Sequence, residues 1–158
     1  KTHRNSQVSQ RKYGLFYRKC STWRSKSFEG TTSMKTILAI ASGAALGANL
    51  RALIIFSSKR FIWSQKFPFD ILICNGLGSL LAGMLYVYTQ NKDLDESLMF
   101  FASIGFLGSL TTFSTFAIDN LKLMQKSSLL MATNILLNVF ITLGLAILGG
   151  WICRKWIA

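Results

Sequence analysis

The sequence predicts an all-α membrane protein with four spanning helices, of which the third is broken, and three observations support this fold class. Apolar residues make up 51% of the 158-residue chain, and its mean hydropathy is positive. Four stretches each approach the ~20 mostly apolar residues that a membrane-spanning helix needs. Charged residues gather in the links between these stretches, whereas each helix of a soluble bundle would carry a polar face.

The first span is expected at residues 37–56. Gly43 and Gly47 form a pair of small residues four apart, a spacing that lets another helix backbone approach closely. Arg51 lies near the end of this span. Its guanidinium could reach the membrane interface, or it could face a water-filled vestibule and attract anions.

The second span is expected at residues 71–88 and contains NGLGSLLAG. Asn75 can donate two hydrogen bonds and accept others, so it could join helices or donate to an ion in transit. Both interpretations stay open. Three glycines in the same stretch favour close helix packing: Gly76, Gly78 and Gly83.

The third span, residues 98–118, contains GFLGSLTTFSTF. Gly105 and Gly108 lower helix stability, and the adjacent threonines Thr111 and Thr112 crowd the preceding turn, so a break in the helix is expected. A break frees backbone groups that are tolerated at membrane depth only where protein, water or an ion satisfies them. Carbonyl oxygens that converge there would suit a hard monovalent cation.

Two phenylalanines, Phe113 and Phe116, follow the expected break at a spacing of three, on one side of the resumed helix. Aromatic rings have a negative face and a positive edge, so two rings presented edge-on could contact an anion. The alternative is that both rings serve ordinary packing.

The fourth span, residues 129–152, carries Asn134, Asn138 and Thr142. Spacings of four place all three on one helical face. Such a polar track along an apolar helix is expected to line a path for something small and hydrated.

The basic residues lie mainly before the first span and at the ends of the spans. Residues 1–33 carry eight of the 18 lysines and arginines and are expected to be a disordered extension before the four-helix domain at 34–158. We interpret this extension as a leader, a mis-start or a tag, with a transit peptide or a lipid-binding arm as alternatives. The remaining link and end charges balance across the membrane and set no orientation, which allows pairing with an inverted copy. They are Lys35, Lys92, Arg154 and Lys155 on one side, and Lys59, Arg60, Lys66, Lys122 and Lys126 on the other.

Several function classes lose support from the composition. The three cysteines have no metal-ligand or disulfide spacing, and no nucleophile–base pair is visible, so an enzyme is not expected. No nucleic-acid-binding signature is present, and nucleic acid is therefore not an expected partner.

These motifs together resemble the small bacterial fluoride channels called Fluc or CrcB. GFLGSLTTFSTF is similar to the family's third-span signature, ICNGLGSLLAG to its second-span motif, and SGAALGANLR to its first-span motif. The resemblance covers Met34 to about Ile152. It implies antiparallel homodimers inserted in both orientations, with two fluoride pathways and a central structural Na⁺.

The resemblance also implies roles for residues of this chain. The carbonyls of Gly108 and Thr111 would bind Na⁺, while Phe113 and Phe116 would contact fluoride. Asn75 would be the second-span hydrogen-bond donor, Arg51 the vestibule arginine, and Ser114 and Thr115 would supply nearby hydroxyls. The chain departs from the family at Asn134, where a tyrosine is usual, and mildly at Asp119, where glutamate is common.

The function expected from this resemblance is passive efflux of cytoplasmic fluoride across a bacterial inner membrane, which protects the cell from fluoride toxicity. A small multidrug exporter is the main alternative, but such exporters use a carboxylate inside the membrane, and Asp70 and Asp119 lie at span ends. A non-transporting membrane assembly protein is the second alternative. Whether the partner is an identical or a related chain is left open.

Overall fold

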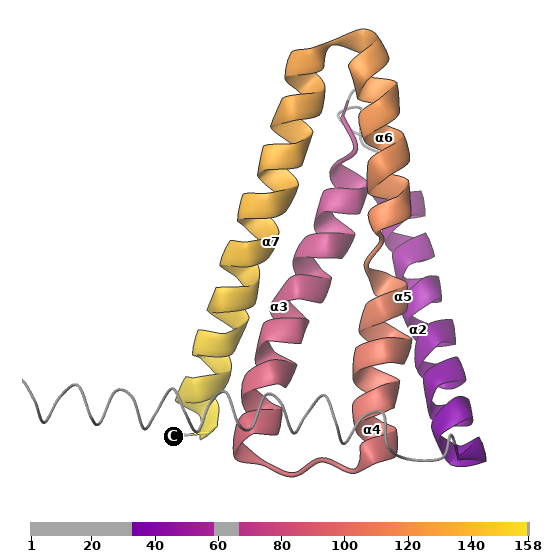
Figure 1. Ribbon diagram of the computed structural model, residues 1–158, viewed down its shortest axis with the longest axis vertical. Coiled ribbons are helices and arrows are strands. Elements are labelled where there is room, and N and C mark those ends of the chain that lie inside the picture. The colour runs from indigo at the N-terminus through magenta and orange to yellow at the C-terminus, as the bar shows by residue number, and fades with distance from the viewer. Residues whose placement is uncertain (1–32, 59–66, 158) are drawn as a thin grey trace, which may run out of the picture. The chain divides into compact units, whose positions relative to one another are not determined.

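The computed structural model describes residues 33–58 and 67–157 (Figure 1). Four helical segments in this part of the chain are long and apolar enough to cross a membrane: Met34–Ser58, Phe69–Asn91, Glu96–Lys126 and Ser128–Ile157. The prediction of four spans is confirmed, and each helix continues a few residues past the predicted apolar stretch. The last helix has 30 residues and is therefore about 45 Å long, which exceeds the ~30 Å hydrocarbon core of a bilayer.

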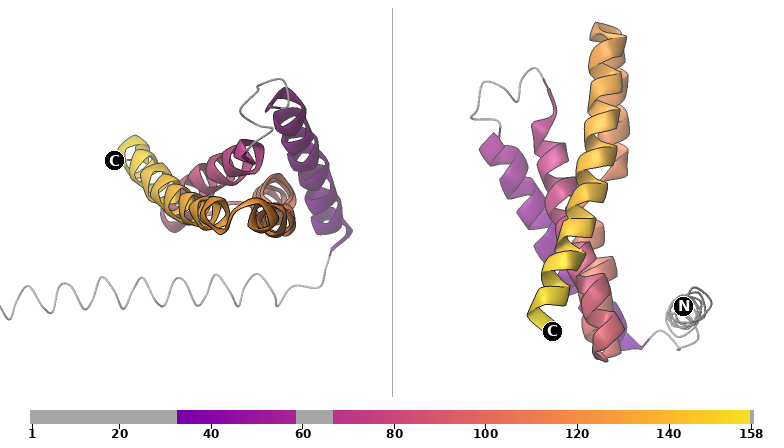
Figure 2. Two further views of the ribbon diagram at one scale, coloured as in Figure 1. Left: turned by 90° about the horizontal axis from the view of Figure 1, so that it is seen from above. Right: turned by 90° about the vertical axis from the view of Figure 1, so that its left-hand side faces the viewer.

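Three of the spans are single helices: α2 (Met34–Ser58), α3 (Phe69–Asn91) and α7 (Ser128–Ile157). The other span consists of α4 (Glu96–Phe100), the π-helix η2 (Phe101–Leu107), α5 (Gly108–Leu110) and α6 (Phe113–Lys126). Successive spans run in opposite directions, and the break between α5 and α6 lies about halfway along the third span (Figures 1 and 2).

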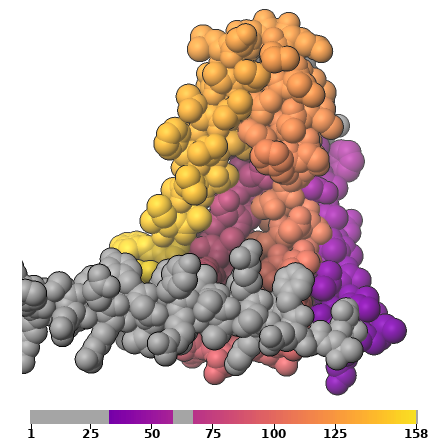
Figure 3. Space-filling view, in the orientation of Figure 1, coloured from indigo at the N-terminus to yellow at the C-terminus, as the bar shows by residue number. Residues whose placement is uncertain are grey.

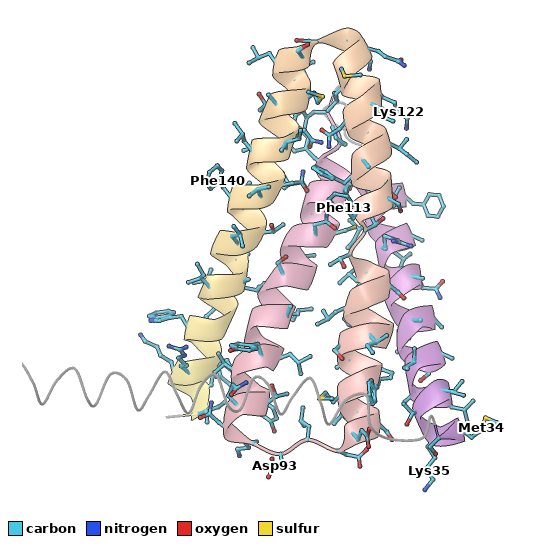
Figure 4. All side chains as sticks on the ribbon, viewed as in Figure 1. Met34, Lys35, Asp93, Phe113, Lys122 and Phe140 are labelled. Carbon is cyan, nitrogen blue, oxygen red and sulfur yellow. The ribbon has the colours of Figure 1, made fainter. Side chains whose placement is uncertain are left out.

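The ends of the spans carry the charged links. Lys35 and Asp93 lie at one end of the bundle and Lys122 at the other, as an alternation of four spans requires (Figure 4). The predicted extension at 1–33, apart from Ser33, and the link residues Lys59, Arg60 and Lys66 lie outside the described residues.

Helices α3 and α7 pack together along their lengths because glycines remove the side chains between them. A Cβ atom on Gly83 would collide with the carbonyl oxygen of Ala146, and one on Gly149 with the carbonyl oxygen of Leu80. The contact is therefore backbone against backbone at two levels. Gly76 allows a looser approach, in which a Cβ would lie 3.0 Å from Cδ1 of Leu145.

Helix α2 packs against the π-helix η2 through a second set of glycines. Cβ atoms on Gly43 and Gly47 would collide with the carbonyl oxygens of Phe101 and Phe106, respectively. On the η2 side, a Cβ on Gly105 would lie 2.6 Å from the carbonyl oxygen of Ile40. These glycines bring the first and third spans into backbone contact.

Of the four residues expected together to favour the break, the two glycines do not form it. Gly105 lies inside η2 and Gly108 begins α5, both with helical backbone. Gly105 is required by the close approach of α2, because no side chain fits between the two backbones. The backbone leaves the helical conformation at Thr111 and Thr112 instead.

Large apolar side chains cover the outside of the bundle. Leu53 is 62% exposed, Phe140 69% and Ile147 74%, and Figure 4 shows the Phe140 ring pointing away from the other helices. In the space-filling view of Figure 3, side chains of α6 and α7 form the upper part of the visible face, and α2 lies along its right-hand side. A contiguous apolar exterior of this kind is stable only against lipid or against another apolar surface.

Candidate ion pathway at the helix break

The third span breaks at two threonines whose side chains satisfy backbone groups on both sides. Thr111 has an extended ψ of 154°, and Thr112 is extended with φ −150° and ψ 123°. The Thr111 hydroxyl donates to the carbonyl of Leu107 at 2.9 Å, at the end of α5. The Thr112 hydroxyl accepts from the N–H of Thr115 at 3.3 Å and so caps the N-terminus of α6. The predicted break is thus confirmed, with threonine chemistry at its centre.

Asn75 of α3 replaces the helical partners that Thr112 lacks. Its Oδ1 accepts from the Thr112 N–H at 2.9 Å, and its Nδ2 donates to the Thr112 carbonyl at 3.4 Å. In an unbroken helix the Thr112 N–H would donate to the carbonyl of Gly108. That carbonyl therefore loses its helical donor and becomes available to another partner.

A second bond from Asn75 starts a chain of amides through the bundle. Nδ2 of Asn75 donates to Oδ1 of Asn138 at 3.3 Å, and Nδ2 of Asn138 donates to Oδ1 of Asn134 at 3.1 Å. Nδ2 of Asn134 donates to Oδ1 of Asn120 at 2.9 Å, and Nδ2 of Asn120 donates to the carbonyl of Phe116 at 2.9 Å. We call the side chains of these four asparagines the amide relay.

Three members of the amide relay are buried, Asn75 is half-buried, and all four are bonded to one another in sequence. Asn134 is 1% exposed, Asn138 6% and Asn120 8%. Among the described residues, every buried polar side-chain atom has a hydrogen-bond partner. Thr142 lies on the same face of α7 but does not join another helix, because its hydroxyl donates to the carbonyls of Asn138 and Val139 on its own helix.

Asn120 was absent from the residues selected by sequence reasoning. It lies beyond the predicted end of the third span, in a stretch interpreted as a polar link. Helix α6 instead continues to Lys126, which places Asn120 inside the helix and opposite Asn134 of α7. A short turn at Ser127 follows, and equal distances of Asn120 and Asn134 from that turn are the signal that could have revealed the pair.

Hydroxyl groups gather beside the break. The Thr112 hydroxyl lies 3.3 Å from that of Ser114 and 3.1 Å from that of Thr115. Each of the three hydroxyls has one hydrogen atom, which can rotate about the C–O bond. These hydrogen atoms can therefore turn toward a neighbouring anion.

The two phenylalanines after the break form a pair. The ring centroids of Phe113 and Phe116 are 5.5 Å apart, and the ring planes are tilted by 48°. Phe113 is 80% exposed and Phe116 is half-buried. Figure 4 shows Phe113 beside the break, at the start of α6. Apart from Phe116, the described residues leave most of the Phe113 ring uncovered.

Arg51 of α2 reaches toward the break. Its Nη1 lies 3.5 Å from the carbonyl oxygen of Thr111, and the side chain is partly buried. The ion pair found in the described part of the chain joins Lys122 and Asp119, so no carboxylate there neutralises Arg51. The guanidinium therefore places a positive charge beside the break.

Gly78 allows α3 to approach the break closely. A Cβ atom at this position would collide with Cγ2 of Thr111. The missing side chain lets Asn75, one turn earlier on α3, reach the backbone of Thr112.

Known proteins resemble the part of the chain that forms the four spans. Residues 38–151 match the family model described as "CrcB-like protein, Camphor Resistance (CrcB)". A protein of Campylobacter jejuni subsp. jejuni serotype O:2 (strain ATCC 700819 / NCTC 11168), named "Fluoride-specific ion channel FluC", is 44% identical over 117 residues, which cover 73% of this chain and 95% of that protein.

Two relatives from other bacteria have the same name, "Fluoride-specific ion channel FluC". The protein of Shewanella halifaxensis (strain HAW-EB4) is 38% identical over 117 residues, and that of Shewanella baltica (strain OS185) is 40% identical over 118 residues. Each alignment covers 73% of this chain and 94% of the relative. With four apolar spans, a third span broken at Thr111–Thr112 and these matches across the whole bundle, the chain belongs to the CrcB family.

Proposed function

We propose that this chain forms a fluoride channel that lets cytoplasmic fluoride leave the cell passively. The observation that carries the proposal is the broken third span, where Asn75 bonds Thr112, three hydroxyls lie together, a pair of phenylalanine rings follows, and Arg51 places a positive charge beside the break. Its relatives named as fluoride-specific channels support the same function.

Asn75 has the donor that a fluoride ion needs. Fluoride is small and tightly hydrated, so a pathway must replace its water with hydrogen-bond donors. Both Nδ2 bonds of Asn75 are long, 3.4 Å to Thr112 and 3.3 Å to Asn138, whereas its Oδ1 bond is 2.9 Å. The weak pair of bonds can be exchanged for an anion while the strong bond keeps the side chain in place.

The aromatic pair would contact fluoride on the side of the ion that faces away from the asparagine amides. A second copy of the chain packed against the exposed face of Phe113 would exclude lipid from that ring and enclose the pathway. We therefore propose a dimer of inverted copies, which the balanced link charges permit. In such a dimer, Arg51 would attract anions toward each entrance, and Asn134, Asn138 and Thr142 would continue the polar route along α7.

A sodium ion at the dimer centre fits part of the chemistry at the break. The Gly108 carbonyl has lost its helical donor, and carbonyl oxygens suit a hard cation. Thr111 fits less well, because its carbonyl already faces the Arg51 guanidinium at 3.5 Å. Both carbonyls would bind sodium if the guanidinium turned toward the vestibule, and the ion would then hold the two broken helices together.

Passive movement outward needs no coupled proton. Hydrogen fluoride enters uncharged and dissociates in a less acidic cytoplasm. An inside-negative potential then drives the anion out by about 2.3 kcal/mol per charge per 100 mV. A proton-coupled exporter would need a carboxylate within the pathway. The acid of α6, Asp119, is instead paired with Lys122 at 3.2 Å.

The function can be tested with purified protein in liposomes loaded with potassium fluoride or potassium chloride. A fluoride or chloride electrode would record efflux after addition of valinomycin. We expect rapid fluoride efflux and little chloride efflux from the unaltered chain, and slower fluoride efflux from Phe113→Ile and Asn75→Ser. Equal leakage of both halides would refute a fluoride-selective channel. Efflux of neither halide would also refute the proposal and would favour a non-transporting assembly protein.

A further inference from the structure

We propose that Asn120 is a positioning residue of the ion pathway, and that it acts by fixing the amide of Asn134. The inference rests on the proposed fluoride channel, because it concerns how one donor group of that pathway is held. It adds to that pathway a residue that lies on α6, beyond the break and the phenylalanine pair.

The backbone sets the direction of the amide relay at both ends. The N–H of Thr112 can only donate, so Asn75 must turn its oxygen toward it. The carbonyl of Phe116 can only accept, so Asn120 must turn its nitrogen toward it. Between these fixed ends, each amide has one orientation in which a donor meets an acceptor at every junction.

Asn134 is the relay member whose amide depends on other side chains. Asn75 bonds the backbone of Thr112, Asn138 bonds the carbonyl of Asn134 at 3.1 Å, and Asn120 bonds that of Phe116. The side chain of Asn134 instead bonds only amides among the described residues: its Oδ1 accepts from Asn138, and its Nδ2 donates to Asn120. Its orientation is therefore set by its neighbours in the relay.

The bond to Asn120 determines which group Asn134 offers to an ion. Nδ2 carries two N–H groups, and within the described residues the structure gives it one acceptor, Oδ1 of Asn120 at 2.9 Å. The second N–H has no acceptor among the described residues, so it is the donor that remains for an ion. Without Asn120 the amide would lose its only acceptor at a site that is 1% exposed. A buried amide nitrogen without an acceptor is costly, and only the bond from Asn138 to Oδ1 would then orient the side chain.

The chain therefore uses an asparagine pair, Asn120 and Asn134, to hold a donor at the α7 side of the pathway. The pair links α6 to α7 across the turn at Ser127, close to the end of the bundle. Asn120 also donates to the carbonyl of Phe116, so its action through Asn134 must be separated by experiment from any action through Phe116.

A double-mutant cycle tests this dependence. The variants are Asn120→Leu, Asn134→Leu and the double variant, all of which replace an amide by an apolar side chain of similar size. Asn91→Leu is the matched control, because the Asn91 amide likewise donates to the carbonyl four residues earlier, at 2.7 Å, but lies at the end of α3, outside the relay. Fluoride efflux, chloride efflux and the melting temperature would be measured for each at equal protein-to-lipid ratio.

We expect Asn120→Leu to slow fluoride efflux about tenfold, the scale of one lost orienting hydrogen bond, and Asn91→Leu to leave it unchanged. In the Asn134→Leu background, Asn120→Leu should have no further effect on fluoride efflux. Its effect on melting temperature should also be smaller there, because no unpaired Asn134 amide remains.

Three other outcomes would overturn the inference. If the two substitutions add independently in the efflux assay, Asn120 does not act through Asn134. If they are coupled in melting temperature but Asn120→Leu leaves fluoride efflux unchanged, Asn120 has only a structural role. If the unaltered chain passes no fluoride, the proposed function itself fails, and the pathway role of Asn120 fails with it.

Discussion

Two glycines of α7 should respond in opposite directions to the same substitution. A Cβ atom on Gly149 would collide with the carbonyl oxygen of Leu80 and would lie 2.9 Å from its carbonyl carbon and 3.3 Å from its Cα. A Cβ atom on Gly144 would meet nothing within 4 Å. Gly149→Ala and Gly144→Ala therefore add the same methyl group to the same helix, in contact with a neighbouring backbone in one case and in open space in the other.

The magnitude follows from two terms. Replacing glycine by alanine inside a helix stabilises it by about 0.8–1 kcal/mol, and this gain is common to both variants. The collision at Gly149 involves main-chain atoms of α3, which cannot rotate away, so the helices must separate. Overpacking of this kind costs about 1–3 kcal/mol and sometimes more. The difference in unfolding free energy between the two variants should therefore equal the overpacking cost, about 1–3 kcal/mol.

The assay is unfolding in mixed micelles of mild detergent and increasing sodium dodecyl sulfate. Trp151 is two residues from Gly149, and its fluorescence provides the signal. Gly144→Ala should unfold at a higher dodecyl sulfate fraction than the unaltered protein, and Gly149→Ala at a lower one. If the two variants shift in the same direction by the same amount, α3 and α7 do not touch through their backbones as described.

Three further substitutions test other parts of the bundle. Thr112→Val removes the hydroxyl that accepts from the Thr115 N–H. The unfolding free energy should therefore fall by about 1 kcal/mol, the usual value of an N-cap, and the melting temperature should fall with it. Arg51→Gln removes the positive charge that lies 3.5 Å from the Thr111 carbonyl, and fluoride efflux should fall while Arg51→Lys keeps most of it; equal rates for both variants would contradict an electrostatic role. Lys122→Ala breaks an exposed ion pair at 3.2 Å and should change the unfolding free energy by less than about 1 kcal/mol, so a larger loss would mean that the pair is buried in the assembly.

The sequence was sufficient to predict the four spans and the existence of a break. Apolar runs separated by charged links have few alternative explanations, and consecutive β-branched residues within a glycine-containing run disfavour a continuous helix. The ends of the helices were less predictable. Helix α6 runs to Lys126, past the predicted end at 118, because backbone hydrogen bonding continues after the apolar run stops.

The role of each small residue was harder to predict. A glycine can loosen a helix or let another backbone approach, and the choice depends on partners distant in the sequence. Gly105 serves the second purpose because Ile40 of α2 lies against it. Asn75 presented the same ambiguity, and the structure shows it bonding the backbone of Thr112 and the amide of Asn138.

The backbone contact between α3 and α7 also bears on how quickly ions can pass. Interlocked main chains at Gly83 and Gly149 leave these two helices no room to slide or tilt against each other. We therefore expect the backbones of Asn75 and Asn138, one from each helix, to keep their spacing while the bond between the two side chains is exchanged for an anion. If these two helices wall the proposed pathway, we expect it to conduct without a moving gate between them, with a rate set by how long each anion stays bound to its donors.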